Sequence, residues 1–114
     1  MRAATLARVS DERQVDRLSL PAQVRAMREY CDHEGWEVVR EYQAEGESAF
    51  TSELSRRPVL AQAVADAECG LFDIFVIHES SRLARNERLS HEILDRLQAA
   101  GVRLVCQSRG LMSQ

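Results

Sequence analysis

The chain carries a serine and several arginines at positions from which they could act together on a phosphate group. Ala7-Arg8-Val9-Ser10 is typical of a short strand that ends in a serine, with an arginine two residues before it. Ser81-Arg82-Leu83-Ala84-Arg85-Asn86 places a second arginine pair just after a buried apolar run. Arginines bind phosphate oxygens in forked pairs and stabilise the charge that develops in phosphoryl transfer. One hydroxyl among such groups would suit attack on a phosphate.

Two ordinary interpretations compete with this one. Serine after a strand is common turn chemistry, and arginines three residues apart usually form a solvated helix face. A serine nucleophile also needs activation, usually by a histidine. None of His33, His78 and His91 has a sequence position that obviously provides it. The arginines would have to supply the help themselves, without a metal ion.

Composition narrows the class of protein. A chain of 114 residues with 5% aromatics fits one domain with a core of Val, Leu, Ile and Ala. The formal net charge of −3 excludes a uniformly basic surface, so contact with DNA must use a local arginine patch or other chain. Cys31, Cys69 and Cys106 show no disulfide or metal spacing, and we expect buried thiols in a reducing cytosol. We see no signal peptide or membrane span.

Strand and helix signals alternate along the chain. The expected strands cover residues 3–9, 36–42, 74–77 and 102–106, and the continuous apolar run at 74–77 favours a central strand. The first expected helix has Ser19 as its N-cap and Pro21 in its first turn, and Gly35 stops it. The second runs from Pro58 to Gly70, and the third covers residues 90–100. Residues 43–56 read as a long polar loop, and the tail 107–114 carries no signal. The pattern predicts a three-layer α/β/α fold, flavodoxin-like, with a mostly parallel sheet of four to five strands.

A parallel sheet would bring the serine and the arginines to one place. All its strands point the same way, so the loops that follow them share one edge, where ligand sites form. Ser10 ends the first expected strand, and Arg82 and Arg85 follow the third. Arg8 and Ser10 are two residues apart on an extended segment, so their side chains leave the same face. The loop that carries Arg57 also follows a strand and could fold over the same place.

Together these segments resemble the catalytic domain of the serine recombinases, the resolvase and invertase family. The motifs that carry the resemblance occur in order over nearly the whole chain. They are Ala7-Arg8-Val9-Ser10, Gln14, Leu18-Ser19-Leu20-Pro21-Ala22-Gln23, Glu45-Gly46-Glu47-Ser48, Arg57-Pro58, Phe72-Asp73 and Arg82-Leu83-Ala84-Arg85-Asn86.

The resemblance implies a resolvase-like fold and a site-specific DNA recombinase that needs no metal or nucleotide cofactor. The nucleophile would attack a DNA phosphodiester, form a 5′-phosphoserine link and release a 3′-hydroxyl. The catalytic residues implied are Ser10, Arg8, Arg57, Arg82 and Arg85, supported by Gln14, Gln23, Ser48 and Ser81. The family acts as a dimer on each site and as a tetramer during strand exchange. A cytoplasmic protein, associated with a prokaryotic nucleoid or encoded by a phage or mobile element, is implied as well.

The sequence departs from the family pattern in two ways. The family usually has Leu-Asp before the arginine pair, where this chain has Ser80-Ser81. The missing carboxylate lies in the active site, where it could orient arginines or move protons, and we do not assume that Glu79 replaces it. Family members also continue into a long dimerisation helix and a DNA-binding domain. We therefore expect residues 1–114 to be the catalytic domain without those parts.

Two alternatives remain open at this stage. The absence of the aspartate favours a catalytically silent relative that serves as a subunit-interaction or regulatory module. A flavodoxin-like domain for a small ligand or a phosphoacceptor is favoured by the fold alone. A phosphoacceptor needs clustered aspartates at the strand ends, but the third strand leads into His78-Glu79-Ser80-Ser81. A flavin site would need a glycine-rich phosphate loop.

Overall fold

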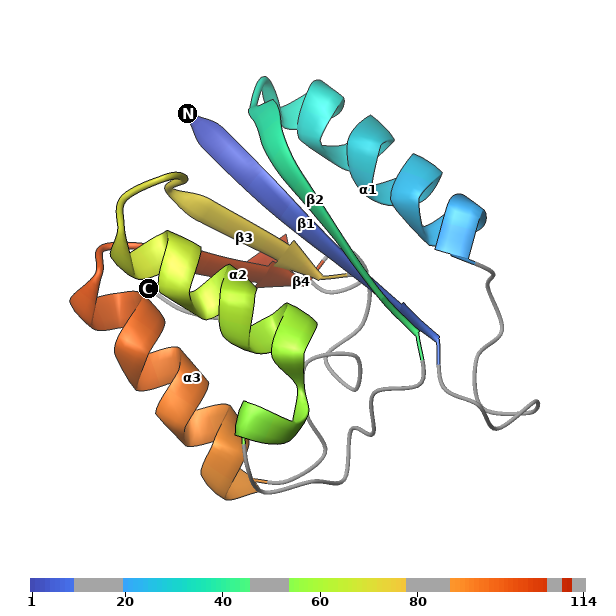
Figure 1. The fold of residues 1–114 in the computed structure, drawn as a ribbon. Coiled ribbons are helices and arrows are strands. Elements are labelled where there is room, and N and C mark those ends of the chain that lie inside the picture. The colour runs from blue at the N-terminus through green and yellow to red at the C-terminus, as the bar shows by residue number, and fades with distance from the viewer. Residues whose placement is uncertain (10–19, 46–53, 78–86, 107–109, 112–114) are drawn as a thin grey trace.

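Helices cover both faces of a twisted sheet, as the computed structural model of residues 1–9, 20–45, 54–77, 87–106 and 110–111 shows (Figure 1). The sheet strands are β1 (Arg2–Val9), β2 (Glu37–Glu45), β3 (Ile74–Ile77), β4 (Arg103–Cys106) and β5 (Gly110–Leu111). Over the described residues they lie in the order β2-β1-β3-β4-β5. The first four are parallel, and β5 runs antiparallel to β4. The expected three-layer fold with a mostly parallel sheet is confirmed.

Three α-helices follow the strands as crossover connections. They are α1 (Leu20–Glu34), α2 (Pro58–Glu68) and α3 (Glu87–Ala99), and a 3₁₀ turn, η1 (Leu54–Arg56), precedes α2. Gly35 follows the last residue of α1, and its φ of +78° is a conformation that glycine adopts without strain. Helix α2 begins at Pro58, whose fixed φ suits the first helical position. Within these described segments, no helix is long and apolar enough to cross a membrane.

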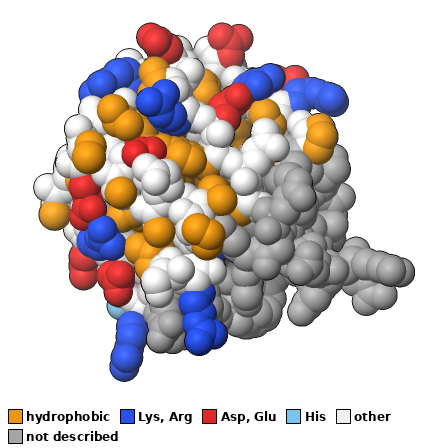
Figure 2. Space-filling model, viewed as in Figure 1, with side chains coloured by type: hydrophobic (Ala, Val, Ile, Leu, Met, Phe, Trp, Pro, Cys, Tyr) orange, Lys and Arg blue, Asp and Glu red, His pale blue; other side chains and the backbone are white. Residues whose placement is uncertain are grey.

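The core has two parts, one on each face of the sheet. Helix α1 covers one face with Val24, Met27 and Cys31, which recur at helical spacing and are buried. Helices α2 and α3 cover the other face. Figure 2 shows the molecule from the α2 and α3 side, where hydrophobic side chains are interspersed with charged ones. Because two apolar layers enclose the sheet, its central strands have no face in water.

Strand β3 has the double-sided burial that its sequence predicts. Ile74 and Val76 pack in the α1 layer, and Phe75 and Ile77 pack in the α2–α3 layer. All four side chains have an exposed fraction of 0%. Burial on both faces suits a strand in the middle of a parallel sheet, and β3 lies between β1 and β4.

Several predicted boundaries need correction. Strand β2 ends at Glu45, three residues later than expected, because its pairing with β1 continues to the partners Val9 and Glu45. Helix α3 begins at Glu87 rather than at residue 90. The expected polar loop contains η1, and the tail that carried no signal contributes β5. Cys69 is exposed just after α2, whereas Cys31 and Cys106 are buried as expected.

We expect Phe75→Ala to lower the free energy of unfolding by about 3–5 kcal/mol, the usual cost of deleting a buried phenyl ring. The Phe75 ring is fully buried and lies 5.8 Å from the Phe72 ring between centroids. Urea unfolding followed by circular dichroism measures the change. The exposed α2 position Ala65→Ser is the control and should cost no more than about 0.5 kcal/mol. A loss below about 1 kcal/mol for Phe75→Ala would contradict this packing.

Candidate active site

The candidate site is the carboxyl edge of the sheet, toward which the neighbouring strands β1 and β3 both run. The two strands are parallel neighbours, with Leu6 opposite Ile77. From β1 the chain crosses through α1 to β2 on one side, and then through α2 to β3 on the other side. This reversal of strand order is a topological switch point, where ligands bind in open α/β sheets. The segments that follow Val9 and Ile77 therefore leave the sheet from adjacent strands.

Most of the predicted site residues fall outside the described part of the chain. They are Ser10, Gln14, Ser48, Ser81, Arg82 and Arg85. The backbone of Arg8 belongs to β1 and is the register partner of Ala44, while its side chain is not described. The convergence of the serine and the arginines stays a prediction.

Arg57 is the predicted catalytic arginine whose side chain the structure describes. It is the N-cap residue of α2, and its exposed fraction is 0%, whereas the neighbouring Arg56 is exposed. Its backbone N–H donates to the Leu54 carbonyl at 2.9 Å, and its carbonyl accepts from the Ala61 N–H at 2.8 Å. Arg57 takes part in a further interaction, although its buried Nε atom donates no hydrogen bond. Because α2 follows β2 in a parallel crossover, this cation lies toward the carboxyl edge of the sheet.

Gln23, a predicted supporting residue, approaches the same edge from the opposite face. It lies in the first turns of α1, which follows β1, and its side chain has an exposed fraction of 0%. Helix α1 packs on one face of the sheet and α2 on the other. The two described candidates, Gln23 and Arg57, are thus brought to one edge from different layers.

An ion pair that sequence reasoning missed fastens α1 to the outer strand β2. The Arg28 Nε and NH2 atoms donate to the two carboxylate oxygens of Glu41, and the NH2 contact measures 2.6 Å. These hydrogen bonds lower the pKa of Glu41 and raise the pKa of Arg28. Arg28 and Glu41 are thirteen positions apart in the sequence, and they come into contact only when α1 packs against β2. No local spacing could have revealed the pair.

A second polar contact joins β2 to α2. The Tyr42 hydroxyl donates to one carboxylate oxygen of Asp66 at 2.6 Å, and the Gln62 amide donates to the other at 2.7 Å. Burial, together with the hydrogen bond to Asp66, raises the pKa of Tyr42. The spacing of Gln62 and Asp66 in one helix was visible in the sequence, but the long-range tyrosine partner was not. This contact holds the helix whose first residue follows Arg57.

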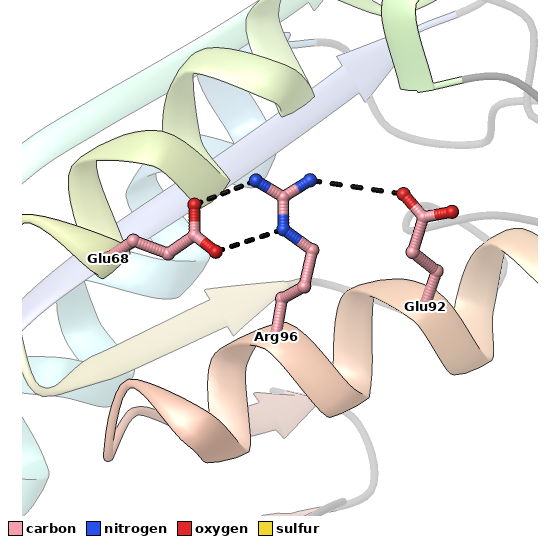
Figure 3. A network of polar contacts seen from close by, with 3 residues as sticks. All are labelled: Glu68, Glu92 and Arg96. Atoms are coloured by element: carbon pink, nitrogen blue, oxygen red, sulfur yellow. Dashed lines mark hydrogen bonds and ion pairs between the residues drawn. The ribbon is translucent and has the colours of Figure 1, made fainter.

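Arg96 on α3 lies between two carboxylates and joins α3 to α2 (Figure 3). Its NH2 and Nε atoms contact Glu68 at 2.7 Å and 3.0 Å, and its NH1 atom lies 3.8 Å from Glu92. The side chains of Arg96 and Glu68 remain 37% and 40% exposed, so solvent screens the attraction. We regard this network as a brace between helices rather than part of the site.

Among the described residues, no group of three or more His, Cys, Asp or Glu side chains is placed to hold a metal ion. The described carboxylates with shifted pKa values, Glu41 and Glu68, are hydrogen-bonded to arginines. The described candidates toward this edge, Arg57 and Gln23, carry a guanidinium and an amide, which are groups that can donate hydrogen bonds to an anion.

Comparisons with known proteins point to one family. Residues 3–114 match the family described as "Resolvase, N terminal domain". The N-terminal catalytic domain of TP901-1 integrase is 22% identical, with 96% of this chain and 79% of that chain covered and a TM-score of 0.80. A resolvase family site-specific recombinase from Streptococcus pneumoniae is 25% identical, with 96% and 74% covered and a TM-score of 0.78. The C-terminal catalytic domain of ISC1926 TnpA, an IS607-like serine recombinase, is 24% identical, with 93% and 69% covered and a TM-score of 0.78. No curated protein matches the chain.

We expect acid to remove the stabilisation that the pair of Arg28 and Glu41 provides. The pKa of Glu41 is lowered in the folded state, so the contribution is complete above the unfolded carboxyl pKa of about 4.3 and is lost as pH falls through the folded value. Glu41→Gln should therefore flatten the decline of the unfolding free energy below about pH 4.3. Its effect on the unfolding free energy at neutral pH should be small, because Arg28 is largely exposed and solvent screens the pair.

Chemical denaturation at a series of pH values measures this dependence. Glu29→Gln is the control for loss of a carboxylate. Glu29 is exposed on α1, the helix that carries Arg28, and makes no ion pair among the described residues. A pH dependence in Glu41→Gln identical to that of the unchanged protein would contradict the role given to the pair.

Proposed function

The chain belongs to the resolvase N-terminal domain family, and from this premise we propose that it is the catalytic domain of a site-specific DNA recombinase with Ser10 as its nucleophile. The observation that carries the proposal is the parallel pairing of β1 with β3. Ser10 follows β1 in the sequence, and the segment with Arg82 and Arg85 follows β3. The two segments therefore start from neighbouring strands. A switch point at that edge is where this fold class binds ligands.

The proposed reaction is a transfer of one phosphodiester bond. The Ser10 Oγ attacks the phosphorus, the bond from phosphorus to the 3′ oxygen breaks, and a 5′-phosphoserine link forms. The proton that the serine hydroxyl gives up is balanced by the proton that the departing 3′ oxygen takes on. In the reverse step, the 3′-hydroxyl of an exchanged strand attacks the phosphoserine and releases the serine. The bond energy stays in the protein–DNA link, so neither a metal ion nor a nucleotide is required.

The arginines would provide most of the electrostatic stabilisation of the transition state. Arg8, Arg82 and Arg85 would hold the scissile phosphate from β1 and from the segment after β3. Arg57 would approach from α2, whose N-terminal end has a partial positive charge that also favours an anion. An arginine that stabilises the phosphoryl transition state can contribute about 10³- to 10⁵-fold in rate. Several of them compensate for the lack of an obvious histidine base.

The remaining predicted residues would assist. Gln14, Gln23, Ser48 and Ser81 can donate hydrogen bonds to phosphate oxygens or to the arginines' surroundings. Gln23 is suited to a fixed position because it is buried in α1. Exchange between two DNA sites requires at least two active centres, in keeping with dimers on each site and tetramers during exchange. We propose these assemblies on the basis of the family alone. On the same basis we propose that the protein associates with a prokaryotic nucleoid or is encoded by a phage or mobile element.

A catalytically silent relative is the second candidate, and Ser81 is the observation that favours it. The family's usual aspartate at this position is absent, and a carboxylate there could orient the arginines. A silent domain would keep the fold and the subunit contacts while it lost cleavage. The family match removes the support for the flavodoxin-like small-ligand alternative.

We expect Ser10→Ala to reduce covalent protein–DNA adducts to background, because alanine has no hydroxyl to form the phosphoserine link. The assay incubates the full recombinase with DNA fragments from around its own coding region and counts adducts that survive denaturation. Mass spectrometry then locates the phosphoserine. Ser55→Ala, an exposed serine in η1, is the control and should leave adduct formation unchanged. Adducts at the normal level in Ser10→Ala would rule out the assigned nucleophile.

We expect the unchanged chain to form adducts already, and Ser81→Asp to raise their rate of formation by orienting the arginines. Ser81→Asn has nearly the same shape without the charge and should not produce this gain. Single-turnover cleavage followed by denaturing electrophoresis measures the rates. Cleavage that appears only in Ser81→Asp would favour the silent relative.

A further inference from the structure

A hollow between α1 and the outer strand β2 is lined by groups that suit a phosphate. It has a volume of about 350 Å³ and is lined by Pro21, Val24, Arg25, Arg28 and Gln43. Small-molecule pockets begin at about 300 Å³, so the space can hold one nucleotide unit. Its lining combines two guanidinium groups and an amide with the apolar surfaces of proline and valine. That mixture fits an anion attached to a sugar.

Arg25 is the uncompensated cation of this hollow. It is exposed and makes no hydrogen bond or ion pair among the described residues. Arg28 differs, because its Nε and NH2 atoms are committed to Glu41. A guanidinium has five N–H donors, so Arg28 keeps its NH1 hydrogens for a further acceptor. An anion in the hollow would thus find one unopposed charge and additional donors.

The hollow lies toward the same edge of the sheet as the candidate active site. Pro21 is in the first turn of α1, which follows β1. Gln43 is the register partner of Ala7, two residues before β1 ends at Val9. At about 3.3 Å per residue, this is about 7 Å short of the end of that strand. Each DNA strand carries a phosphate every 3.4 Å or so of helix axis, so a few nucleotides span the interval.

An extended peptide added to the β2 edge fits less well. The register between β1 and β2 shifts between Ala3 and Ala4, which leaves Val39 as a bulge in β2. Bulges and exposed charges such as Arg40 are features that prevent pairing at an edge strand. The arginines also call for an acidic partner, which a phosphate backbone is along its whole length.

We propose that this hollow binds a backbone phosphate of the DNA beside the cleaved bond, with Arg25 as the group that holds it. The inference rests on the proposed recombinase function and adds a contact outside the predicted catalytic set. Because phosphate contacts set register rather than sequence, this one would align the DNA strand with the end of β1.

Salt dependence of DNA binding tests the contact. The full chain is titrated with a short duplex of arbitrary sequence over a series of low salt concentrations. A lost phosphate contact should reduce the slope of log affinity against log salt by about 0.9. We expect this reduction in Arg25→Gln and recovery of the slope in Arg25→Lys. Circular dichroism checks that each variant is folded.

Arg103→Gln is the matched control, because it removes the same charge from an exposed arginine at the amino end of β4. It should change the slope less than Arg25→Gln does. Equal slopes for the two variants would overturn the proposal, because they would show only a general charge effect. Tighter binding of polyglutamate than of the duplex, with the same dependence on Arg25, would also overturn it in favour of an acidic peptide.

The adduct assay separates this inference from the proposed function. If adducts form and Arg25→Gln has the slope of Arg103→Gln, the hollow is not a DNA contact but the recombinase chemistry holds. If the slopes differ as expected and no Ser10 adduct forms, the contact holds and the proposed chemistry fails.

Discussion

The pairing of β1 with two parallel neighbours is the constraint on which the rest of the structure depends. Strand β1 is hydrogen-bonded to β2 on one side and to β3 on the other. Its described core side chains are buried on both faces of the sheet. Because the chain leaves β1 for β2 and returns to β3, the switch point must fall at the end of β1. Ser10, the proposed nucleophile, is the next residue in the sequence after that end.

Charge is distributed in a way that suits a phosphate site on an acidic protein. A buried guanidinium costs several kcal/mol unless its surroundings compensate it. Arg57 is fully buried at the start of α2, where it takes part in further interactions. Two exposed arginines have carboxylate partners: Arg28 contacts Glu41, and Arg96 contacts Glu68. A net charge of −3 opposes indiscriminate binding to nucleic acid while leaving local attraction intact.

The sequence predicted the elements and their layering because those depend on local periodicity. The apolar run of β3, the spacing of buried residues in α1 and the proline at the start of α2 were all readable. What it missed depends on partners distant in the chain. β2 reaches Glu45 only because β1 pairs with it, and β5 exists only against β4. For the site, the sequence predicted which residues take part and that they share the carboxyl edge of the sheet. Of these residues, Arg57 and Gln23 are described, and both lie toward that edge. The ion pair of Arg28 and Glu41, and the lack of a partner for Arg25 among the described residues, became visible only in the folded structure.

These observations also bear on how a small domain could align a long substrate. The scissile phosphate alone fixes one point, and a strand held at one point can still rotate about it. A second phosphate contact on another element removes that freedom, and its usefulness depends on a rigid link to the first. The register of β1 with β2 provides such a link, since Gln43 is paired with Ala7 and α1 is fastened to β2 through Arg28 and Glu41. Orientation of this kind can lower the barrier to reaction without any new group at the reacting atoms.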